Sequence, residues 1–418
     1  MSAGAPWWKV ASVWLARIVA GGAFTVSGWA KSVDPRGFVY KLQEYLAAWH
    51  LDGIFTTDIL AIAAVGLSLF EFIVGVFLLT GCLRRSSAIS GLLMMAVMLP
   101  LTAYIAVADP VQDCGCFGDL FVVSNTVTFL KNILITGALV AALVWHKAAR
   151  PLYRPGIQWL VGVLAGIYAL TVAVIGWQFQ PVVDFRPYKI GETLVTEDGA
   201  ADIRYVYSKD GREEVFGLDA LPDSTWTFVA PENNVALTEG LAIFDGDYDV
   251  TEELLAPGDS TRTLLLAVTE PGIDNLVRSR MANEMAEYAD AHGYRMIGVV
   301  ALSGDALQQW IEMARPEYDV YSASDTSLKQ LVRGEIGLVM LEDGHVVWKR
   351  NFSTLSPDML EEPNPFDNVT VVDDGRVAMW LTIFFAAGML LLRGISALTN
   401  ITLRPKRKRT KDEQSTTK

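Results

Sequence analysis

The sequence predicts a polytopic α-helical membrane protein that also carries a separate, acidic α/β domain outside the membrane. About half of the residues are hydrophobic (51%) and the mean hydropathy is +0.30, yet 19% are charged, so the two populations must occupy different parts of the chain. Residues 181–376 hold 37 acidic and 15 basic residues, a net charge of −22, and the remainder carries +9 within the total of −13. This acidic balance argues against a nucleic-acid partner, because the domain has too few cations to neutralise phosphates.

Six segments reach or approach the length of about 20 apolar residues that a membrane-spanning helix needs. They are Val10–Trp29, Phe55–Thr80, Ser87–Ala108, Asn125–Trp145, Ile157–Phe179 and Val377–Leu398. The first could be taken for a cleaved signal peptide, but its length and Arg17 in its middle favour a helix that stays in the protein. The lipid bilayer is therefore the first partner that we expect.

The distribution of Lys and Arg in the short loops predicts the orientation of the spans. Basic residues follow the second span at 84–85, the fourth span at 146–154 and the sixth span at 404–409, so these stretches are expected in the cytoplasm. Both termini are then cytoplasmic, and residues 181–376 lie on the outer side of a bacterial inner membrane, in the periplasm. Three basic residues of the first outer loop oppose this orientation: Lys31, Arg36 and Lys41.

A short amphipathic helix is expected between the first two spans. Asp34 before Pro35 is a helix-start signal, and apolar residues recur at helical spacing as far as Trp49. The helix could lie on the outer membrane surface or pack against the helix bundle, and the sequence leaves both alternatives open.

Residues 181–260 predict an irregular β-rich segment, in which short strands alternate with turns such as Lys209-Asp-Gly211 and Asp245-Gly-Asp247. The second of these turns suggests a calcium loop, but it lacks glycine at the sixth loop position and glutamate at the twelfth. A turn followed by an N-capped helix is the preferred interpretation.

Residues 261–375 follow a regular alternation that predicts a three-layer α/β sandwich. The expected order is strand 263–269, helix 274–291, strand 295–302, helix 304–314, strand 318–322, helix 325–332, and strands 337–342 and 345–349 around Asp343-Gly344. This order resembles the thioredoxin fold. Where a redox-active thioredoxin has Cys-x-x-Cys, the chain has Glu270–Asn275, and Glu335-Ile336 stand where the cis-proline is expected. The resemblance implies a degenerate thioredoxin-like module that binds a partner protein and exchanges no disulfides itself.

The motifs of the first two spans have a recognisable pattern: Arg17, Ser27-Gly-Trp-Ala-Lys31, Asp34-Pro35, Glu71-x-x-x-Gly75, and a span end at Gly81 followed by Arg84. The pattern resembles the DoxX family of integral membrane proteins. The run Cys114-Gly-Cys-Phe-Gly-Asp119, between the third and fourth spans, is similar to the MauE branch of the same superfamily.

This resemblance implies a DoxX/MauE-like four-helix membrane domain over residues 1–150 and a link to disulfide formation and redox-protein maturation. The fifth span then occupies 151–180, the sixth 376–400 and a basic tail 401–418. With its outer domain, the chain resembles DoxX-family proteins of the Bacteroidetes type.

A polar site inside the membrane is expected from Arg17, Lys31 and Glu71. Arg17 and Glu71 lie within apolar spans, where an unpaired charge is costly, so they should face each other or a polar cavity. An ion pair that only fixes helix packing and a site that binds a ligand such as a quinone both remain open. Quinone is the one cofactor that we consider, and no metal site is expected.

Cys114 and Cys116 are two of only three cysteines in the chain. On an oxidising face they would form disulfides, and a bridge across one glycine closes a tight, easily reduced ring, which is typical of a redox pair. A static clip, alone or as two bridges to a partner, and a metal site are the alternatives. Asp113 and Asp119 would raise the pKa of a neighbouring thiol, which counts against an activated nucleophile. Cys82, at the cytoplasmic end of the second span, cannot reach the other two cysteines and is expected to be a buried free thiol.

Two functional hypotheses follow. In the first, the protein supports thiol/disulfide or quinone-linked chemistry of an envelope partner through Cys114 and Cys116. In the second, it is a non-enzymatic envelope scaffold whose outer domain binds a partner protein. Whether the protein is an enzyme stays open at this stage.

Overall fold

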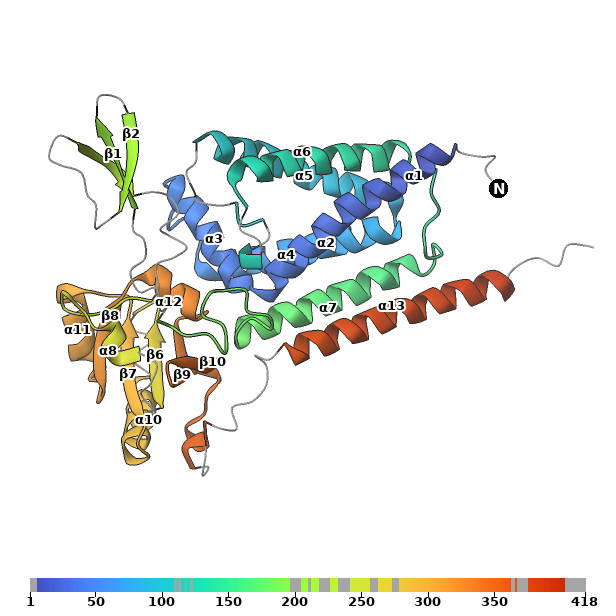
Figure 1. Ribbon diagram of the computed structural model, residues 1–418. Coiled ribbons are helices and arrows are strands. Elements are labelled where there is room, and N and C mark those ends of the chain that lie inside the picture. The colour runs from blue at the N-terminus through green and yellow to red at the C-terminus, as the bar shows by residue number, and fades with distance from the viewer. Residues whose placement is uncertain are drawn as a thin grey trace, which may run out of the picture. The chain divides into compact units, whose positions relative to one another are not determined.

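The computed structural model describes residues 6–108, 111, 114–116, 118–120, 123–195, 204–209, 212–217, 226–231, 241–255, 262–272, 278–361, 365–366 and 375–402 (Figure 1). Contacts divide the chain into two compact units, residues 1–173 with 378–418, and residues 174–377. We call them the membrane unit and the soluble unit.

Six helices of the described residues are long and apolar enough to cross a membrane. The first span runs from Trp7 to Val33 and consists of α1 (Trp7–Ala16), a π-helical turn (Arg17–Gly21) and α2 (Gly22–Val33). The other spans are α4 (Thr57–Thr80), α5 (Arg84–Ala108), α6 (Asn125–Val144), α7 (Gln158–Gln178) and α13 (Arg376–Thr402). The predicted number and order of spans are therefore confirmed.

The short helix α3 (Pro35–Ala48) follows the first span without a long loop. Its first turn is capped by the Asp34 side chain, which accepts a hydrogen bond from the backbone nitrogen of Gly37 at 2.9 Å. Val39 and Tyr45 on this helix are buried within the membrane unit. These contacts favour the alternative in which α3 packs against the bundle.

Helices α7 and α13, far apart in the sequence, lie side by side in the membrane unit (Figure 1). The rings of Tyr168 and Phe385 stack with centroids 4.7 Å apart, and the Tyr168 and Thr382 hydroxyls are 2.9 Å apart. Trp29 of α2 donates a hydrogen bond from its indole nitrogen to the Tyr168 hydroxyl at 3.0 Å. The fifth and sixth spans therefore pack against each other, and the fifth span also contacts the first span through Trp29.

The soluble unit contains a seven-stranded mixed sheet in the order β10-β9-β6-β7-β8-β4-β5. Its strands are β4 (Ile243–Asp245), β5 (Tyr248–Asp249), β6 (Thr263–Val268), β7 (Arg295–Val300), β8 (Asp319–Ala323), β9 (Ile336–Glu342) and β10 (His345–Asn351). Strands β6, β7 and β8 are parallel, and β9 runs antiparallel to both β6 and β10. The predicted alternation of strands and helices is confirmed; residues 274–277, the predicted start of the first helix, lie outside the described residues.

Helices cover both faces of this sheet. On one face, α10 (Ser279–Ala291) and α11 (Gly304–Ala314) pack on Leu264, Leu266 and Val268 of β6. On the other face, α12 (Asp325–Leu331) and the short α8 (Thr251–Leu255) pack on Leu265 and Ala267 of the same strand. All six residues of β6 are buried, as expected for a strand with both faces covered.

The turn between β9 and β10 has the conformation that its sequence predicts. Asp343 has φ 53° and Gly344 has φ 74°, and β10 pairs antiparallel with β9 from His345 opposite Glu342. Two consecutive positive φ angles are the requirement of a type I′ hairpin turn, for which Asp-Gly is a preferred pair.

The segment before residue 261 contributes to two sheets. Strands β1 (Arg204–Lys209), β2 (Arg212–Gly217) and β3 (Thr227–Pro231) form a small antiparallel sheet, whereas β4 pairs with β8 and extends the main sheet. The turn at Asp245-Gly-Asp247 joins β4 to β5, and Asp249 accepts a hydrogen bond from the Thr251 backbone nitrogen at the start of α8. The predicted turn and short helix are present, but Asp249 stands one residue before the N-cap position, which Val250 occupies. Residues 210–211 of the other predicted turn lie outside the described residues.

A buried cluster of charged side chains joins the start of the soluble unit to β10. Asp184 accepts from Arg186 Nε at 2.7 Å and from Lys349 Nζ at 2.5 Å, and Lys349 also donates to the Tyr188 carbonyl at 2.7 Å. Burial favours the neutral carboxylic acid, but the charges of Arg186 and Lys349 outweigh it and hold the pKa of Asp184 well below its usual range.

Candidate functional site

A disulfide joins Cys114 and Cys116, whose Cα atoms are 5.4 Å apart. Gly115 between them has φ 61°, and a Cβ there would lie 2.6 Å from Cγ of Lys41 in α3. The turn therefore requires glycine for both its backbone conformation and its close contact with α3. Cys114 is buried, whereas Cys116 is half-buried. Asp113 lies outside the described residues, as does the side chain of Asp119.

We call residues 109–124, between α5 and α6, the cysteine loop. Side chains of three helices donate hydrogen bonds that hold this loop against the bundle. Tyr45 of α3 donates to the Cys114 carbonyl at 2.8 Å, and Ser27 of α2 donates to the Cys116 carbonyl at 2.5 Å. Asn125, the first residue of α6, donates to the Val111 carbonyl at 3.0 Å. The loop is thereby fixed by side chains that the membrane unit supplies.

Helices α2 and α4 approach each other closely below this loop. A Cβ on Gly28 would lie 2.4 Å from the Phe72 backbone nitrogen, and a Cβ on Gly75 would lie 2.4 Å from the Thr25 backbone nitrogen. Small residues at such positions let the backbones of membrane helices make contact. Each glycine belongs to one of the sequence motifs, so these motifs have a packing function.

The close approach brings Lys31 of α2 onto Glu71 of α4. Lys31 Nζ lies 2.6 Å from Glu71 Oε2 and donates a second hydrogen bond to Ser27 Oγ at 3.1 Å. Lys31 Nζ also lies 5.2 Å from the centroid of the Phe38 ring. Lys31 is 4% exposed and Glu71 is 7% exposed, so the two charges form a buried pair. A chain of contacts thus links the Cys116 carbonyl to Ser27, Lys31 and Glu71.

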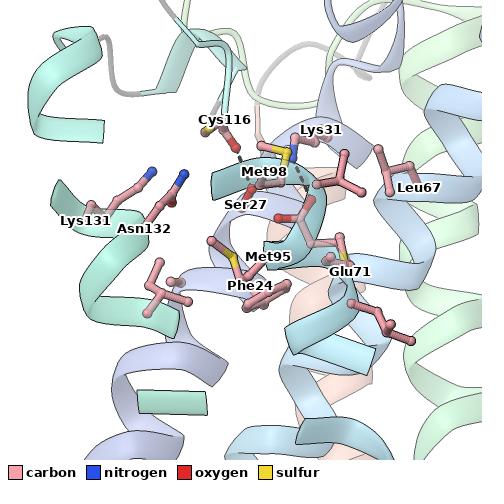
Figure 2. Close-up of a pocket in the computed structure, with 15 residues that line it drawn as sticks. Phe24, Ser27, Lys31, Leu67, Glu71, Met95, Met98, Cys116, Lys131 and Asn132 are labelled. Atoms are coloured by element: carbon pink, nitrogen blue, oxygen red, sulfur yellow. Dashed lines mark hydrogen bonds and ion pairs between the residues drawn. The ribbon is translucent and has the colours of Figure 1, made fainter. Parts of the chain in front are cut away.

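A cavity of about 340 Å³ lies beside this chain of contacts, and we call it the membrane cavity (Figure 2). Its walls are apolar and rich in methionine. The lining residues are Ala23, Phe24, Ser27, Lys31, Leu67, Glu71, Leu93, Met94, Met95, Val97, Met98, Cys116, Lys131, Asn132 and Ile135. Figure 2 shows Cys116, Ser27 and Lys31 close together, with Lys131 and Asn132 of α6 on one side and Leu67 and Glu71 of α4 on the other.

One wall of the membrane cavity lies on the outer surface of the bundle. Leu67 of α4 is 38% exposed, and Leu93 and Val97 of α5 are each 67% exposed. Because α4 and α5 are apolar spans, these exposed side chains are suited to contact lipid tails. The geometry therefore gives a lipid-soluble molecule access to the polar groups near Cys116.

Arg17 lies apart from this site, so of the two predicted alternatives the one in which Arg17 and Glu71 face each other is wrong. Its guanidinium donates to the carbonyls of Arg150 at 3.2 Å and Ala149 at 3.4 Å, and it lies against Gly81 at the end of α4. Glu71 is ten residues before Gly81, which corresponds to about 15 Å along a helix. The sequence shows that Arg17 and Glu71 are both charged and both lie in apolar spans, but it does not show how deep in the bundle each side chain lies. The structure brings Lys31 and Glu71 together and places Arg17 at the other end of the bundle, on the carbonyls of Ala149 and Arg150.

The sequence interpretation missed Ser27 as a contact of the cysteine loop, and it missed Lys131 and Asn132 as lining residues. A signal for Lys131 was present, because it is a charged residue inside the fourth apolar span, where ionisable groups mark functional sites. Asn132 donates a hydrogen bond to Thr102 of α5 at 3.2 Å, so it also joins α6 to α5. The lining of the membrane cavity includes two basic side chains, Lys31 and Lys131, and one acidic side chain, Glu71.

Residues 9–146 match the family model of the methylamine utilisation protein MauE. The match covers the first four spans and the cysteine loop, and with the six apolar helices it fits a MauE/DoxX-like membrane protein. Residues 201–236 match the model of a domain of unknown function, DUF8463. No curated protein matches the chain, and no solved structure matches it. The MauE-like portion therefore contains the whole candidate site.

Two further candidates lie outside the membrane cavity. Cys82 is a free thiol and fully buried, as predicted. In the part of the chain that the structure describes, no group of three or more His, Cys, Asp or Glu side chains could hold a metal ion.

Proposed function

We propose that the protein carries out thiol/disulfide exchange for an envelope partner at Cys114 and Cys116, and that a membrane quinone accepts the electrons. One observation carries this proposal. Cys116 lines an apolar cavity that also contains the Lys31–Glu71 pair and that reaches the lipid-facing surface of α4 and α5. The name of the matched family, which refers to methylamine utilisation, is consistent with a role in maturing a redox protein.

The proposed reaction has two balanced halves. A dithiol of the partner reduces the Cys114–Cys116 disulfide through a mixed disulfide, so the partner gains a disulfide and the loop becomes a dithiol. The loop dithiol is then reoxidised, and its two electrons and two protons are transferred to the acceptor, which leaves as a quinol. The protein itself is unchanged after each cycle.

The residues of the membrane cavity fit a quinone. A volume of about 340 Å³ falls within the range of about 300–1,000 Å³ that is typical of small-molecule sites, and the lining is apolar with a few polar groups. Lys31, Lys131 and Asn132 carry N–H donors that would hold the carbonyl oxygens of the ring. The exposed apolar side chains at the cavity's surface would accept the isoprenoid tail. When bound, the quinone supplies two-electron acceptance from the thiols.

The proposal also includes a location. The basic loops support an inner membrane protein with both termini in the cytoplasm and with the cysteine loop and residues 181–376 on the periplasmic side. The soluble unit, which we propose to be thioredoxin-like, would then bind the partner protein on the same side of the membrane as Cys114 and Cys116.

A second candidate function is a non-enzymatic scaffold. All three cysteines lie outside the soluble unit, so that unit can bind a partner but cannot exchange disulfides. In this case the Cys114–Cys116 bridge is a static clip. The two functions differ in whether the bridge opens under physiological reducing conditions.

The test is the reduction potential of the bridge in purified protein held in lipid nanodiscs. The protein is equilibrated with glutathione buffers, and its thiols are counted for wild type, Cys82→Ser and the double variant Cys114→Ser/Cys116→Ser. We expect a potential above about −300 mV in the wild type and in Cys82→Ser, because structural disulfides have potentials below this value. We also expect the reduced wild type, but not the double variant, to reduce a decyl-substituted benzoquinone under anaerobic conditions.

A potential far below that of the glutathione pool would contradict the redox function, as would an unchanged cellular phenotype of the double variant. Either result would leave the scaffold function standing, which predicts a stable complex between the soluble unit and an envelope protein.

A further inference from the structure

Lys31 lines two separate cavities. One is the membrane cavity, where Lys31 meets Glu71. The other has a volume of about 30 Å³ and is lined by Lys31, Asp34, Gly37, Phe38, Lys41, Gly115 and Gly118. We call it the loop cavity, because two of its lining residues belong to the cysteine loop. The Lys31 ammonium group is therefore the one titratable group common to the two lining sets.

The loop cavity differs in character from the membrane cavity. Its lining includes Asp34 and Lys41 from the start of α3 and the backbone of two glycines, so it offers donors and acceptors. A cavity needs about 10–15 Å³ to hold one water molecule, and its polar walls suit water. The membrane cavity, in contrast, has mostly hydrocarbon and thioether walls, and Lys31, Glu71 and Lys131 are its titratable amine and carboxyl groups among the residues that line it.

Among the side chains that the structure describes, charged groups of α4, α6 and the α3 region line the two cavities with Lys31. Glu71 faces it from α4, Lys131 from α6, and Asp34 and Lys41 from the start and middle of α3. Helix α5 contributes only apolar side chains to the cavity lining, such as Met98. Lys31 thus lies between the polar loop cavity and a mostly apolar cavity in which Glu71 accepts its hydrogen bond.

The proposed reaction requires protons in the membrane cavity. Transfer of two electrons to a quinone creates negative charge in an apolar site, which is unfavourable unless protons follow. The same number of protons leaves the two thiols when the disulfide forms. Cys116 lines the membrane cavity, and its neighbour Gly115 lines the loop cavity, so the loop cavity offers these protons a path to the acceptor.

We propose that Lys31 is the residue that transfers these protons between the loop cavity and the membrane cavity. This inference rests on the proposed function. The Lys31 ammonium gives a proton to the acceptor oxygen, and the N–H bond breaks as the O–H bond forms. The neutral amine is reprotonated, through water in the loop cavity, by a proton that a thiol has released. Two such transfers supply both protons of the quinol. Glu71 and Ser27 hold the amine in place between the two cavities at 2.6 Å and 3.1 Å.

The experiment measures single-turnover reoxidation of the reduced protein by the decyl-substituted benzoquinone, in nanodiscs and without oxygen. The key variant is Lys31→Arg, which keeps a charged donor but cannot give up its proton. We expect reoxidation to slow by about 10²–10⁴-fold, the contribution typical of a general acid. We also expect the quinone to bind with the wild-type dissociation constant. The exposed Lys147→Arg variant, outside both cavities, should react at the wild-type rate.

A second variant separates proton transfer from simple positioning. Lys31→Ala removes the amine, and small primary amines added in solution should restore the rate in proportion to their basicity. A positioning role predicts rescue that does not depend on the pKa of the added amine, and that result would overturn the inference. So would a Lys31→Arg protein that is reoxidised at the wild-type rate.

These results are distinguishable from failure of the proposed function. If the reduced wild type is not reoxidised by the quinone, the proposed function fails before any variant is compared. If the wild type reacts and the Lys31 variants behave as wild type, only the proton-transfer inference fails.

Discussion

Lys31 and Glu71 are individually costly to bury, and the structure compensates each charge with the other. Both side chains are less than 10% exposed, and both lie in spans that are otherwise apolar. Removing one partner of a buried ion pair leaves an uncompensated charge, which costs about 3–5 kcal/mol, whereas removing both often costs little. The pair therefore ties the stability of the bundle to the chemistry of the site.

A double-mutant cycle should detect this coupling. We expect Lys31→Met and Glu71→Gln each to lower the free energy of unfolding by about 3–5 kcal/mol, and the double variant to lose much less than the sum. The measurement is thermal or chemical unfolding in detergent micelles, followed by tryptophan fluorescence. Additive losses within about 0.5 kcal/mol would mean that the two charges are stabilised by other groups.

Asp184 should make the stability of the soluble unit depend on pH. Its pKa in the folded protein is below the unfolded value of about 3.9, because Arg186 and Lys349 outweigh the effect of burial. Its contribution is complete above that unfolded value and is lost as the pH falls through the folded pKa. We expect Asp184→Asn to be less stable than the wild type by about 3–5 kcal/mol at pH 6, with the difference shrinking below pH 4. A difference that stays constant from pH 6 to pH 2 in unfolding experiments would contradict this.

At the scale of elements, the contact between α2 and α4 positions the whole candidate site. Gly28 and Gly75 each face backbone atoms of the other helix, so neither position has room for a side chain. The neighbouring Ser27, Lys31 and Glu71 reach their partners only because the helices are this close. Glycine at these positions serves the contact, since its backbone flexibility has no use inside a regular helix.

Adding one methyl group at either glycine should separate the helices. We expect Gly28→Ala and Gly75→Ala each to cost about 1–3 kcal/mol of stability, as is usual for overpacking. The matched controls are Gly22→Ala in α2 and Gly66→Ala in α4, where a Cβ would meet nothing within 4 Å. Unfolding temperatures in micelles provide the comparison. Equal effects at all four glycines would show that the close approach is unimportant.

At the scale of the whole molecule, the two units divide the chemistry between them. The membrane unit contains all three cysteines and the cavity, and the soluble unit contains the acidic surface and a well-packed α/β core. Any exchange of disulfides must therefore occur in the membrane unit. Under the proposed function, the soluble unit would contribute by binding the partner protein.

Much of this organisation could be predicted from the sequence. Long apolar segments gave the six spans, because crossing a bilayer imposes a minimum length of apolar chain. Short-range rules gave the capped start of α3 at Asp34 and the Asp343-Gly344 hairpin, because both depend on neighbouring residues alone. Strand pairing between distant segments was harder to predict from the sequence. The pairing of β4 with β8, more than 70 residues apart in the chain, was not predicted.

The sequence by itself determined which residues are charged inside the membrane and where the cysteines stand, since composition and spacing are properties of the chain alone. Only the tertiary structure decided that Glu71 meets Lys31 instead of Arg17, and that Lys131 and Asn132 join the same cavity. The physical reason is that partners across helices depend on the depth and rotation of each helix. These are fixed by contacts between distant segments, such as Gly28 against Phe72.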